Sequence, residues 1–130
     1  MAVAVRSSMK DNVPFDKRVA ESRRILGKYP ERVPVICERA ARSDLPEIDK
    51  KKFLVPGSMT CGGYKHIIGK HIEQSRGTEE LGRDAECTIY VFVKDNKTPK
   101  TGSTMADIYE EHKDEDGFLY MTYSAEATLG

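Results

Sequence analysis

The stretch VPVICERAARSDLPEIDKKKFLVP, residues 33–56, holds two strand-like runs separated by a polar loop. The first run, residues 33–39, is rich in β-branched and apolar side chains, and Pro34 sits near its start, where a strand tolerates proline. The second run, residues 52–55, is closed by Pro56 and Gly57. We therefore expect a hairpin with a long loop, and the rest of the fold can be built outward from it.

Helical periodicity flanks this hairpin on both sides. Before it, one stripe is formed by Phe15, Val19, Ser22 and Leu26, and the run ends at residues 27–30. After it, a second helical face is formed by Tyr64, Ile67, Ile68, His71 and Ile72. We expect the second helix to begin at Thr60, and we expect residues 73–86 to form an exposed polar loop.

The last third of the chain supplies two more strands and a short helix. Residues 88–94, TIYVFVK, are apolar on both faces, which predicts a central strand. Thr104 is expected to cap the short helix, with Asp107 three residues on. An acidic turn at residues 114–117 leads into the final strand, residues 118–123. We expect its acidic side chains to be solvated, because the ligand spacing of a calcium loop is absent.

The order of these elements predicts an α+β fold. Two strands, a helix and two further strands suit a four-stranded mixed sheet crossed by a helix, in the ubiquitin-like β-grasp manner, with an added N-terminal helical region. We expect residues 1–13 to be a loosely ordered segment, residues 14–124 to form the domain, and residues 125–130 to form a flexible tail. The tail ends in Gly130, whose missing Cβ would let the narrow channel of an activating enzyme close around it.

Composition places the chain among small soluble domains. Of the 130 residues, 38% are hydrophobic and 32% are charged. No apolar run approaches the roughly 20 residues of a membrane span, and we expect a cytoplasmic protein. The three cysteines are odd in number and widely spaced, so neither a disulfide framework nor a zinc site is indicated. We expect Cys37 to be buried, and we expect no metal or cofactor.

Charge and chemistry narrow the function classes. The net charge is zero, yet residues 1–65 carry 14 Lys and Arg against 8 Asp and Glu. A nucleic-acid binder is usually basic overall, so that class is disfavoured, whereas a basic half either suits an acidic peptide partner or is merely solvated. Cys61 and His66 lie five residues apart on different helical faces, and the sequence shows no other nucleophile–base pair and no phosphate loop. We do not expect an enzyme.

Three long strings resemble the autophagy-related protein 8 family of ubiquitin-like modifiers. They are FDKRVAESRRILGKYPERVPVICER (residues 15–39), IDKKKFLVP (residues 48–56) and STMADIYEEHKDEDGFLYMTYS (residues 103–124). Relatives in that family include the GABA type A receptor-associated protein and the microtubule-associated protein light chains. The resemblance covers most of residues 14–130, apart from residues 73–87, which are longer and more polar than the usual family connection.

The resemblance implies conjugation. In the family the terminal glycine, here Gly130, is activated through ATP by a ubiquitin-activating-like enzyme, passes to a conjugating enzyme and is joined to phosphatidylethanolamine. The free form is then cytoplasmic and the lipidated form sits on the autophagosomal membrane. An autophagy cysteine protease delipidates family members and removes precursor extensions, although no residue follows Gly130 in this sequence.

The resemblance also implies recognition of aromatic-x-x-aliphatic motifs in cargo receptors and adaptors, through a strand added at residues 52–55. The aromatic pocket is expected to be lined by Glu21, Ile25, Pro34, Lys52, Leu54 and Phe118. The aliphatic pocket is expected to involve Phe53, Val55, Pro56, Met59, Tyr64, Ile67 and Ile68. Acidic residues of the motif are expected to meet Lys50, Lys52 and Arg32. His71 stands where the family generally has arginine, which weakens such pairing near neutral pH.

Two alternatives stay open at this point. The chain is an unconjugated peptide-binding adaptor that tethers receptors or microtubule-associated proteins, or it is conjugated to a protein lysine, as in the autophagy-related protein 12 family. The basic N-terminal half motivates the first alternative. The terminal glycine, which both kinds of modifier share, motivates the second.

Overall fold

The computed structural model describes residues 12–40, 45, 47–48, 50–76, 89–94 and 97–125. Within them it shows, in chain order, α2 (Phe15–Lys28), β1 (Arg32–Arg39), β2 (Lys52–Pro56), α3 (Cys61–Arg76), β3 (Tyr90–Phe92), α5 (Met105–His112) and β4 (Leu119–Ser124). The predicted N-terminal segment up to residue 11, most of the expected 73–86 loop and the terminal Gly130 lie outside the described residues.

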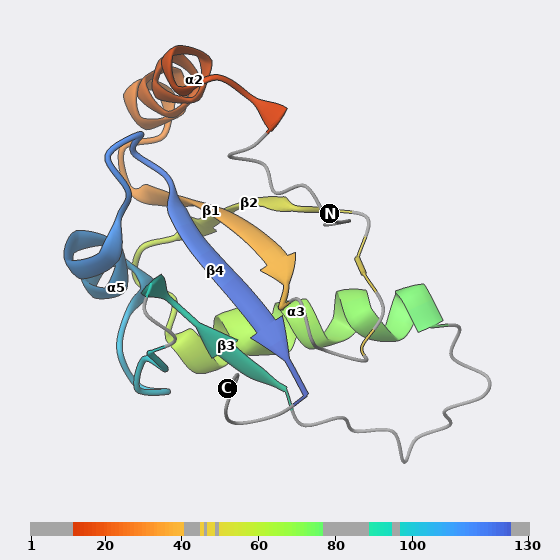
Figure 1. The fold of residues 1–130 in the computed structure, drawn as a ribbon. Helices are drawn as coiled ribbons and strands as arrows, with labels where there is room; N and C mark the ends of the chain where they lie inside the picture. The colour runs from red at the N-terminus through yellow and green to blue at the C-terminus, as the bar shows by residue number, and fades with distance from the viewer. Residues whose placement is uncertain are drawn as a thin grey trace.

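The four strands form one mixed sheet in the order β2-β1-β4-β3, as Figure 1 shows. β1 pairs antiparallel with β2 and parallel with β4, so that Val35 faces Phe53 on one side and Leu119 on the other. β3 pairs antiparallel with β4. The predicted hairpin of β1 and β2 and the mixed four-stranded sheet are confirmed.

The third strand does not lie where the sequence placed it. β3 is short, Tyr90–Phe92, and among the described residues it pairs only with β4, so it is an edge strand and the predicted central position is wrong. Its side chains are nevertheless buried on both faces, with Val91 at 3% and Phe92 at 1% exposure. A strand that is apolar on both faces is therefore expected to be covered on both faces. The pattern does not indicate whether the strand has one neighbouring strand or two.

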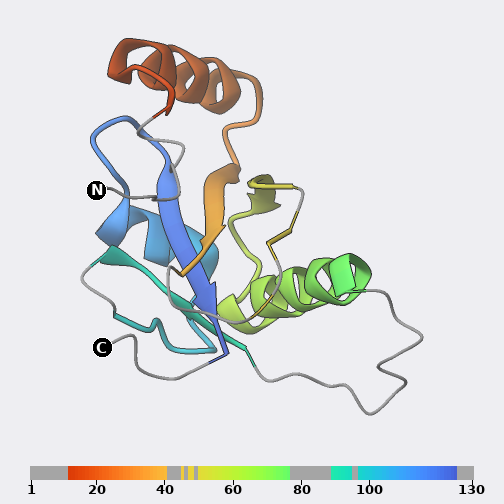
Figure 2. The same cartoon turned by 45° about the vertical axis from the view of Figure 1, so that its right-hand side comes forward.

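The main core lies between one face of the sheet and the helices α3 and α5. Alternate strand residues point into it, including Val35, Phe53 and Leu119, and Tyr64 and Ile68 of α3 meet them with no exposed surface. Helix α2 lies apart from this core, at the end of the sheet where β1 and β4 begin (Figures 1 and 2). The N-terminal helix is thus an addition to the grasp, and its attachment needs its own explanation.

Local signals explain where the helices begin and end. The Oγ1 of Thr104 accepts a hydrogen bond from the backbone N–H of Asp107 at 3.2 Å, which confirms the predicted cap of α5. Helix α3 continues to Arg76, one turn beyond its last apolar position at Ile72, so the loop predicted from residue 73 begins later. Among the residues that the structure describes, no helix is both long and apolar enough to cross a bilayer.

Burial of Cys37 predicts a pH dependence of stability. Desolvation raises the pKa of its thiol from 9.0 to about 12. The native state therefore keeps a proton that the unfolded chain releases, so the contribution of this thiol to stability is constant below pH 9.0 and falls as the pH rises from there toward 12. The slope is about 1.4 kcal/mol per pH unit for one such group. Urea unfolding on either side of pH 9.0 measures it.

A Cys37→Ala variant is the control for this prediction. It is less stable at neutral pH because of the cavity, but its free energy of unfolding should fall less steeply just above pH 9.0. Desolvation also raises the pKa of Tyr123, from 10.0 to about 12. The loss of stability due to Tyr123 therefore begins near pH 10.0, one pH unit above the loss due to Cys37. An equal slope in the wild type and the variant just above pH 9.0 would contradict the assignment to Cys37.

Candidate functional site

A row of apolar side chains crosses three strands on the face of the sheet that is turned away from the main core. Pro34 of β1 is the register partner of Leu54 of β2. Phe118 directly precedes Leu119, the parallel partner of Val35, so Phe118 falls beside Pro34. Pro34 and Phe118 are buried and Leu54 is half-buried. The structure therefore brings together three of the residues predicted for the aromatic pocket.

Helix α2 forms the second side of this row. It carries Glu21 and Ile25, both half-buried and one helical turn apart. The carboxylate of Glu21 accepts from the Nζ of Lys52 at 2.8 and 2.9 Å, which links α2 to the first residue of β2. All six residues predicted for the aromatic pocket thus lie along the junction of α2 with β1, β2 and the start of β4. We call this junction the aromatic subsite.

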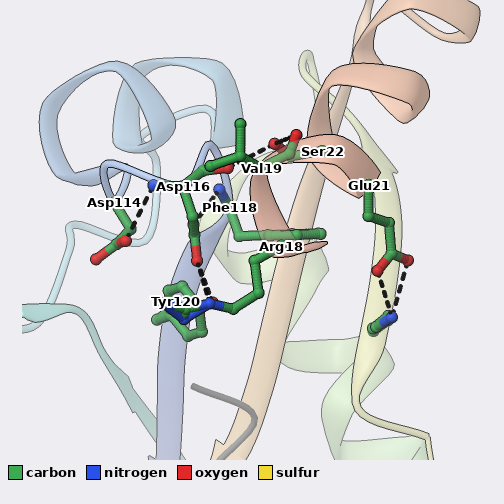
Figure 3. A network of polar contacts seen from close by, with 9 residues as sticks. Arg18, Val19, Glu21, Ser22, Asp114, Asp116, Phe118 and Tyr120 are labelled. Carbon is green, nitrogen blue, oxygen red and sulfur yellow. Dashed lines mark hydrogen bonds and ion pairs between the residues drawn. The ribbon is translucent and has the colours of Figure 1, made fainter. Parts of the chain in front are cut away.

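A buried carboxylate fixes the junction from the side of β4. Asp116 is 1% exposed, and its Oδ2 lies 3.3 Å from the Nε of Arg18 on α2. The hydroxyl of Tyr120 donates to the same oxygen at 2.5 Å, and the backbone N–H of Phe118 donates to Oδ1 at 2.9 Å (Figure 3). The expectation of a fully solvated acidic turn is therefore wrong for Asp116. The Arg18 contact is an ion pair that lacks the alignment of a hydrogen bond.

The backbone of the same turn holds α2 a second time. The hydroxyl of Ser22 donates to the carbonyl of Asp116 at 2.5 Å, with the carbonyl of Val19 3.1 Å away (Figure 3). Gly117 follows with φ +94°, and a Cβ at this position would lie 2.4 Å from the Oγ of Ser22. Only glycine permits both this conformation and this close approach. We call Arg18, Ser22, Asp116 and Gly117 the clasp.

The protonation of Tyr120 matches its role as a donor to the clasp. Burial raises the pKa of its hydroxyl, and the hydrogen bond to Asp116 raises it further. The phenol therefore keeps its proton throughout the physiological range and donates it to the carboxylate. Arg18 also stacks near an aromatic ring, with its guanidinium carbon 5.5 Å from the centre of Phe15.

The residues predicted for the aliphatic pocket fall into two groups. Phe53, Val55, Tyr64 and Ile68 belong to the main core, with exposures between 0% and 5%. Met59 and Ile67 are half-buried and pack against that core, and Pro56 is exposed. The structure brings all seven to one region, where only Met59, Ile67 and Pro56 offer appreciable surface to a ligand.

The cationic residues predicted to meet acidic groups lie at the two ends of β2. The Nζ of Lys50 is 5.0 Å from the ring centre of Phe53, and the rings of Phe53 and His71 form a T-shaped pair at a centroid distance of 5.3 Å. Lys50 is exposed, as is Arg32, which pairs in register with Pro56 at the far end of β2. These side chains are about as far apart as the strand is long, so they cannot serve one acidic group.

Sequence reasoning missed the clasp. One signal was available, because Asp116 followed by Gly117 before a strand is typical of a turn in which the aspartate side chain accepts from the backbone two residues on. Nothing local indicates that the partner of this carboxylate is Arg18, almost a hundred positions earlier. No cluster of three or more metal-ligating side chains occurs among the residues that the structure describes.

Comparisons with known proteins give a consistent result. A family model described as "Autophagy protein Atg8 ubiquitin like" matches residues 17–130. Autophagy-related protein 8b of Arabidopsis thaliana is 54% identical over 125 residues, 96% of this chain and 94% of that protein. Autophagy-related protein 8 of Emericella nidulans is 50% identical over 126 residues, 97% and 98% of the two chains.

Solved structures agree with the sequence comparisons. Plasmodium falciparum Atg8, in complex with a Plasmodium falciparum Atg3 peptide, superposes with a TM-score of 0.82 at 53% identity, covering 95% of this chain and 99% of that one. Trypanosoma brucei ATG8 gives a TM-score of 0.81 at 36% identity, covering 97% and 100%. Both likenesses extend over nearly the whole chain, so they include α2 as well as the grasp.

The two ion pairs of α2 are predicted to differ greatly in strength. Glu21→Gln removes a pair whose side chains are 28% and 44% exposed, and it should change the free energy of unfolding by less than about 1 kcal/mol. Asp116→Asn leaves the largely buried Arg18 without a charged partner and should cost about 3 kcal/mol or more. Chemical denaturation of both variants measures the difference. Equal losses would contradict the importance given to burial.

Proposed function

Because this chain belongs to the Atg8 family of ubiquitin-like autophagy proteins, we propose that it is a modifier joined through Gly130 to phosphatidylethanolamine and that it binds aromatic-x-x-aliphatic motifs. The first activity places the protein on the autophagosomal membrane. The second captures cargo receptors and adaptors there. The free protein is cytoplasmic and acts in autophagosome formation without catalysing a reaction itself.

The proposal of conjugation is supported by a relative and by physical chemistry. Plasmodium falciparum Atg8, 53% identical to this chain, is bound to a peptide of Atg3 in its solved structure. We infer that this chain likewise engages a conjugating enzyme of that kind, after an activating enzyme and before the lipid. An amide to phosphatidylethanolamine adds two acyl chains, and two chains anchor a protein stably where one does so only marginally.

The proposal of motif binding rests chiefly on the free edge of β2. Among the described residues β2 pairs only with β1, so the backbone groups of its outer edge are open to an added strand. The aromatic subsite lies on the face of the sheet that is turned away from the main core. The half-buried Met59 and Ile67 lie on the other face, where they pack against that core. An extended peptide with apolar residues at its first and fourth positions can reach both with its backbone paired to β2.

The conjugation proposal predicts a defined change in mass. Incubation with activating enzyme, conjugating enzyme, ATP and liposomes containing phosphatidylethanolamine should add the mass of one lipid to the full chain, as seen by intact-mass spectrometry. Leu129→Ala should still react, and Gly130→Ala should react far more slowly. A family member known to react is the positive control. No gain in the wild type would falsify the proposal, and a gain of a whole protein would indicate a lysine conjugate instead.

The motif-binding proposal predicts a loss of affinity at the aromatic subsite. Leu54→Ala or Lys52→Ala should weaken a synthetic peptide carrying an acidic residue and an aromatic-x-x-aliphatic motif by about 1–2 kcal/mol, because anchors of small interfaces carry much of the binding energy. Isothermal titration calorimetry measures the change. Lys51→Ala alters the neighbouring charge but not the subsite, so it should retain nearly full affinity. If all three variants bind like the wild type, the peptide sits elsewhere.

A further inference from the structure

We propose that Asp116 is a positioning residue that sets the size of aromatic side chain accepted at the aromatic subsite. This inference rests on the motif-binding function proposed above. An aromatic anchor entering the subsite has α2, with Ile25, on one side and Phe118 on the other. The distance between these two sides decides which ring fits. Asp116 touches neither the anchor nor the peptide, but it is bonded to both sides.

Asp116 holds the sheet side through Phe118. Its Oδ1 accepts from the backbone N–H of Phe118 at 2.9 Å, and its Oδ2 accepts from Tyr120, two residues further along β4. The ring of Phe118 meets that of Tyr120 edge-on at a centroid distance of 6.4 Å. One carboxylate therefore fixes both the backbone of the subsite wall and the ring that supports it.

Asp116 holds the helix side through Arg18 and Ser22. The side chain pairs with Arg18 at 3.3 Å, and the backbone carbonyl accepts from Ser22 at 2.5 Å. Ser22 follows Glu21 directly and precedes Ile25 by three residues, so it lies within one helical turn of both subsite residues on α2. A shift of Ser22 relative to the turn is passed to Ile25 because a helix moves as a rigid element.

The close approach at Gly117 makes this spacing a minimum. A Cβ on residue 117 would lie 2.4 Å from the Oγ and 3.0 Å from the Cβ of Ser22. The existing hydrogen bond from Ser22 to the carbonyl of Asp116, at 2.5 Å, is at the short limit for a hydroxyl donor, so helix α2 lies as near to the β4 turn as this contact allows. The hydrogen bond from Ser22 prevents it from moving outward, and the bare Gly117 allows it to come this far in. The clasp thus fixes the spacing from both directions.

Two variants should change aromatic selectivity in ways that can be read separately. Gly117→Ala keeps every charge but pushes Ser22 and α2 outward, so the ratio of affinities for a tryptophan peptide over a phenylalanine peptide should rise. Asp116→Asn keeps the shape but releases Arg18, so the spacing is no longer fixed and the ratio should also depart from the wild-type value. A misfit of one methylene in an apolar pocket is worth roughly tenfold in selectivity, and we expect ratios to shift about fivefold.

The experiment measures dissociation constants by calorimetry, for the full chain, with two synthetic peptides that differ only in Trp or Phe at the aromatic position. Glu115→Gln, an exposed carboxylate in the same turn, is the matched control and should keep the wild-type ratio. A third peptide with Val in place of Leu at the aliphatic position tests locality, because the clasp does not frame that subsite. Its ratio should be unchanged in every variant.

A second-site substitution separates positioning from stability. Adding Ser22→Ala to Gly117→Ala removes the atom in the closest contact, but it also removes the hydrogen bond that holds α2 and leaves the Cβ of residue 22 3.0 Å from the added Cβ, so the aromatic ratio should move only part of the way back toward wild type. Stability should not recover, because the left-handed backbone of residue 117 remains strained and a hydrogen bond is also lost. If Asp116→Asn fails to fold, the Gly117 series alone decides.

Unchanged aromatic ratios in the folded Gly117→Ala variant would overturn the proposal. A parallel shift of the aliphatic ratio would also overturn it, because that result indicates a general loss of structure. Leu54→Ala distinguishes a failure of the motif-binding proposal from a failure of the inference about Asp116. If this variant binds like the wild type, motif binding at the subsite is wrong; if it weakens binding while the clasp variants keep the wild-type ratio, only the inference about Asp116 fails.

Discussion

The buried carboxylate of Asp116 anchors the N-terminal helix to the ubiquitin-like grasp of this protein. Asp116 has no appreciable exposed surface, and burial of an unpaired charge would cost far more than an ordinary domain can offset. Its oxygens therefore need Arg18, Tyr120 and the backbone of Phe118, and the helix is held where these partners can be reached. The position of α2 thus depends on this group together with the hydrogen bond from Ser22 and the Glu21–Lys52 pair.

Because α2 is attached at one end of the sheet, the two faces of the sheet have different roles. The face that carries Val35, Phe53 and Leu119 packs against α3 and α5 and forms the main hydrophobic core. The opposite face, with Pro34 and Leu54, is left for α2, which covers it only at one end. Because strand residues alternate between faces, a five-residue strand such as β2 contributes to the core and to a recognition surface at once.

Patterns local in sequence predicted the fold well. The hairpin of β1 and β2, the two long helices and the Thr104 cap all follow from periodicity, proline placement and capping chemistry, which act over a few residues. The edge position of β3 could not be predicted, because an apolar strand with both faces covered has the same sequence pattern at an edge as in the centre. The resemblance of the long strings identified the family, and the order of elements alone would not have done so.

The candidate site was predictable only in part, because local sequence patterns do not show which distant segments meet. Glu21, Ile25, Pro34, Lys52, Leu54 and Phe118 lie along one junction, and their role as a peptide pocket stays a prediction. The clasp was missed because Asp116 belongs to an acidic run, beside Asp114 and the exposed Glu115. A run of charged residues is normally predicted to be exposed to solvent. Only the folded structure, in which the turn before β4 contacts α2, shows that Asp116 differs from its neighbours. Pairings between distant segments of this kind are invisible to any short window of sequence.

Amide hydrogen exchange tests the central claim most directly, namely that a peptide pairs with the edge of β2 beneath the clasped helix. Exchange is measured on the full chain with and without a saturating aromatic-x-x-aliphatic peptide. The account predicts that the outward-facing amides of residues 52–55 and the amides of α2 gain protection, because the first pair with the peptide and the second close over its anchor. Protection gained instead at the other edge, Tyr90–Phe92, with no change at β2, would contradict it.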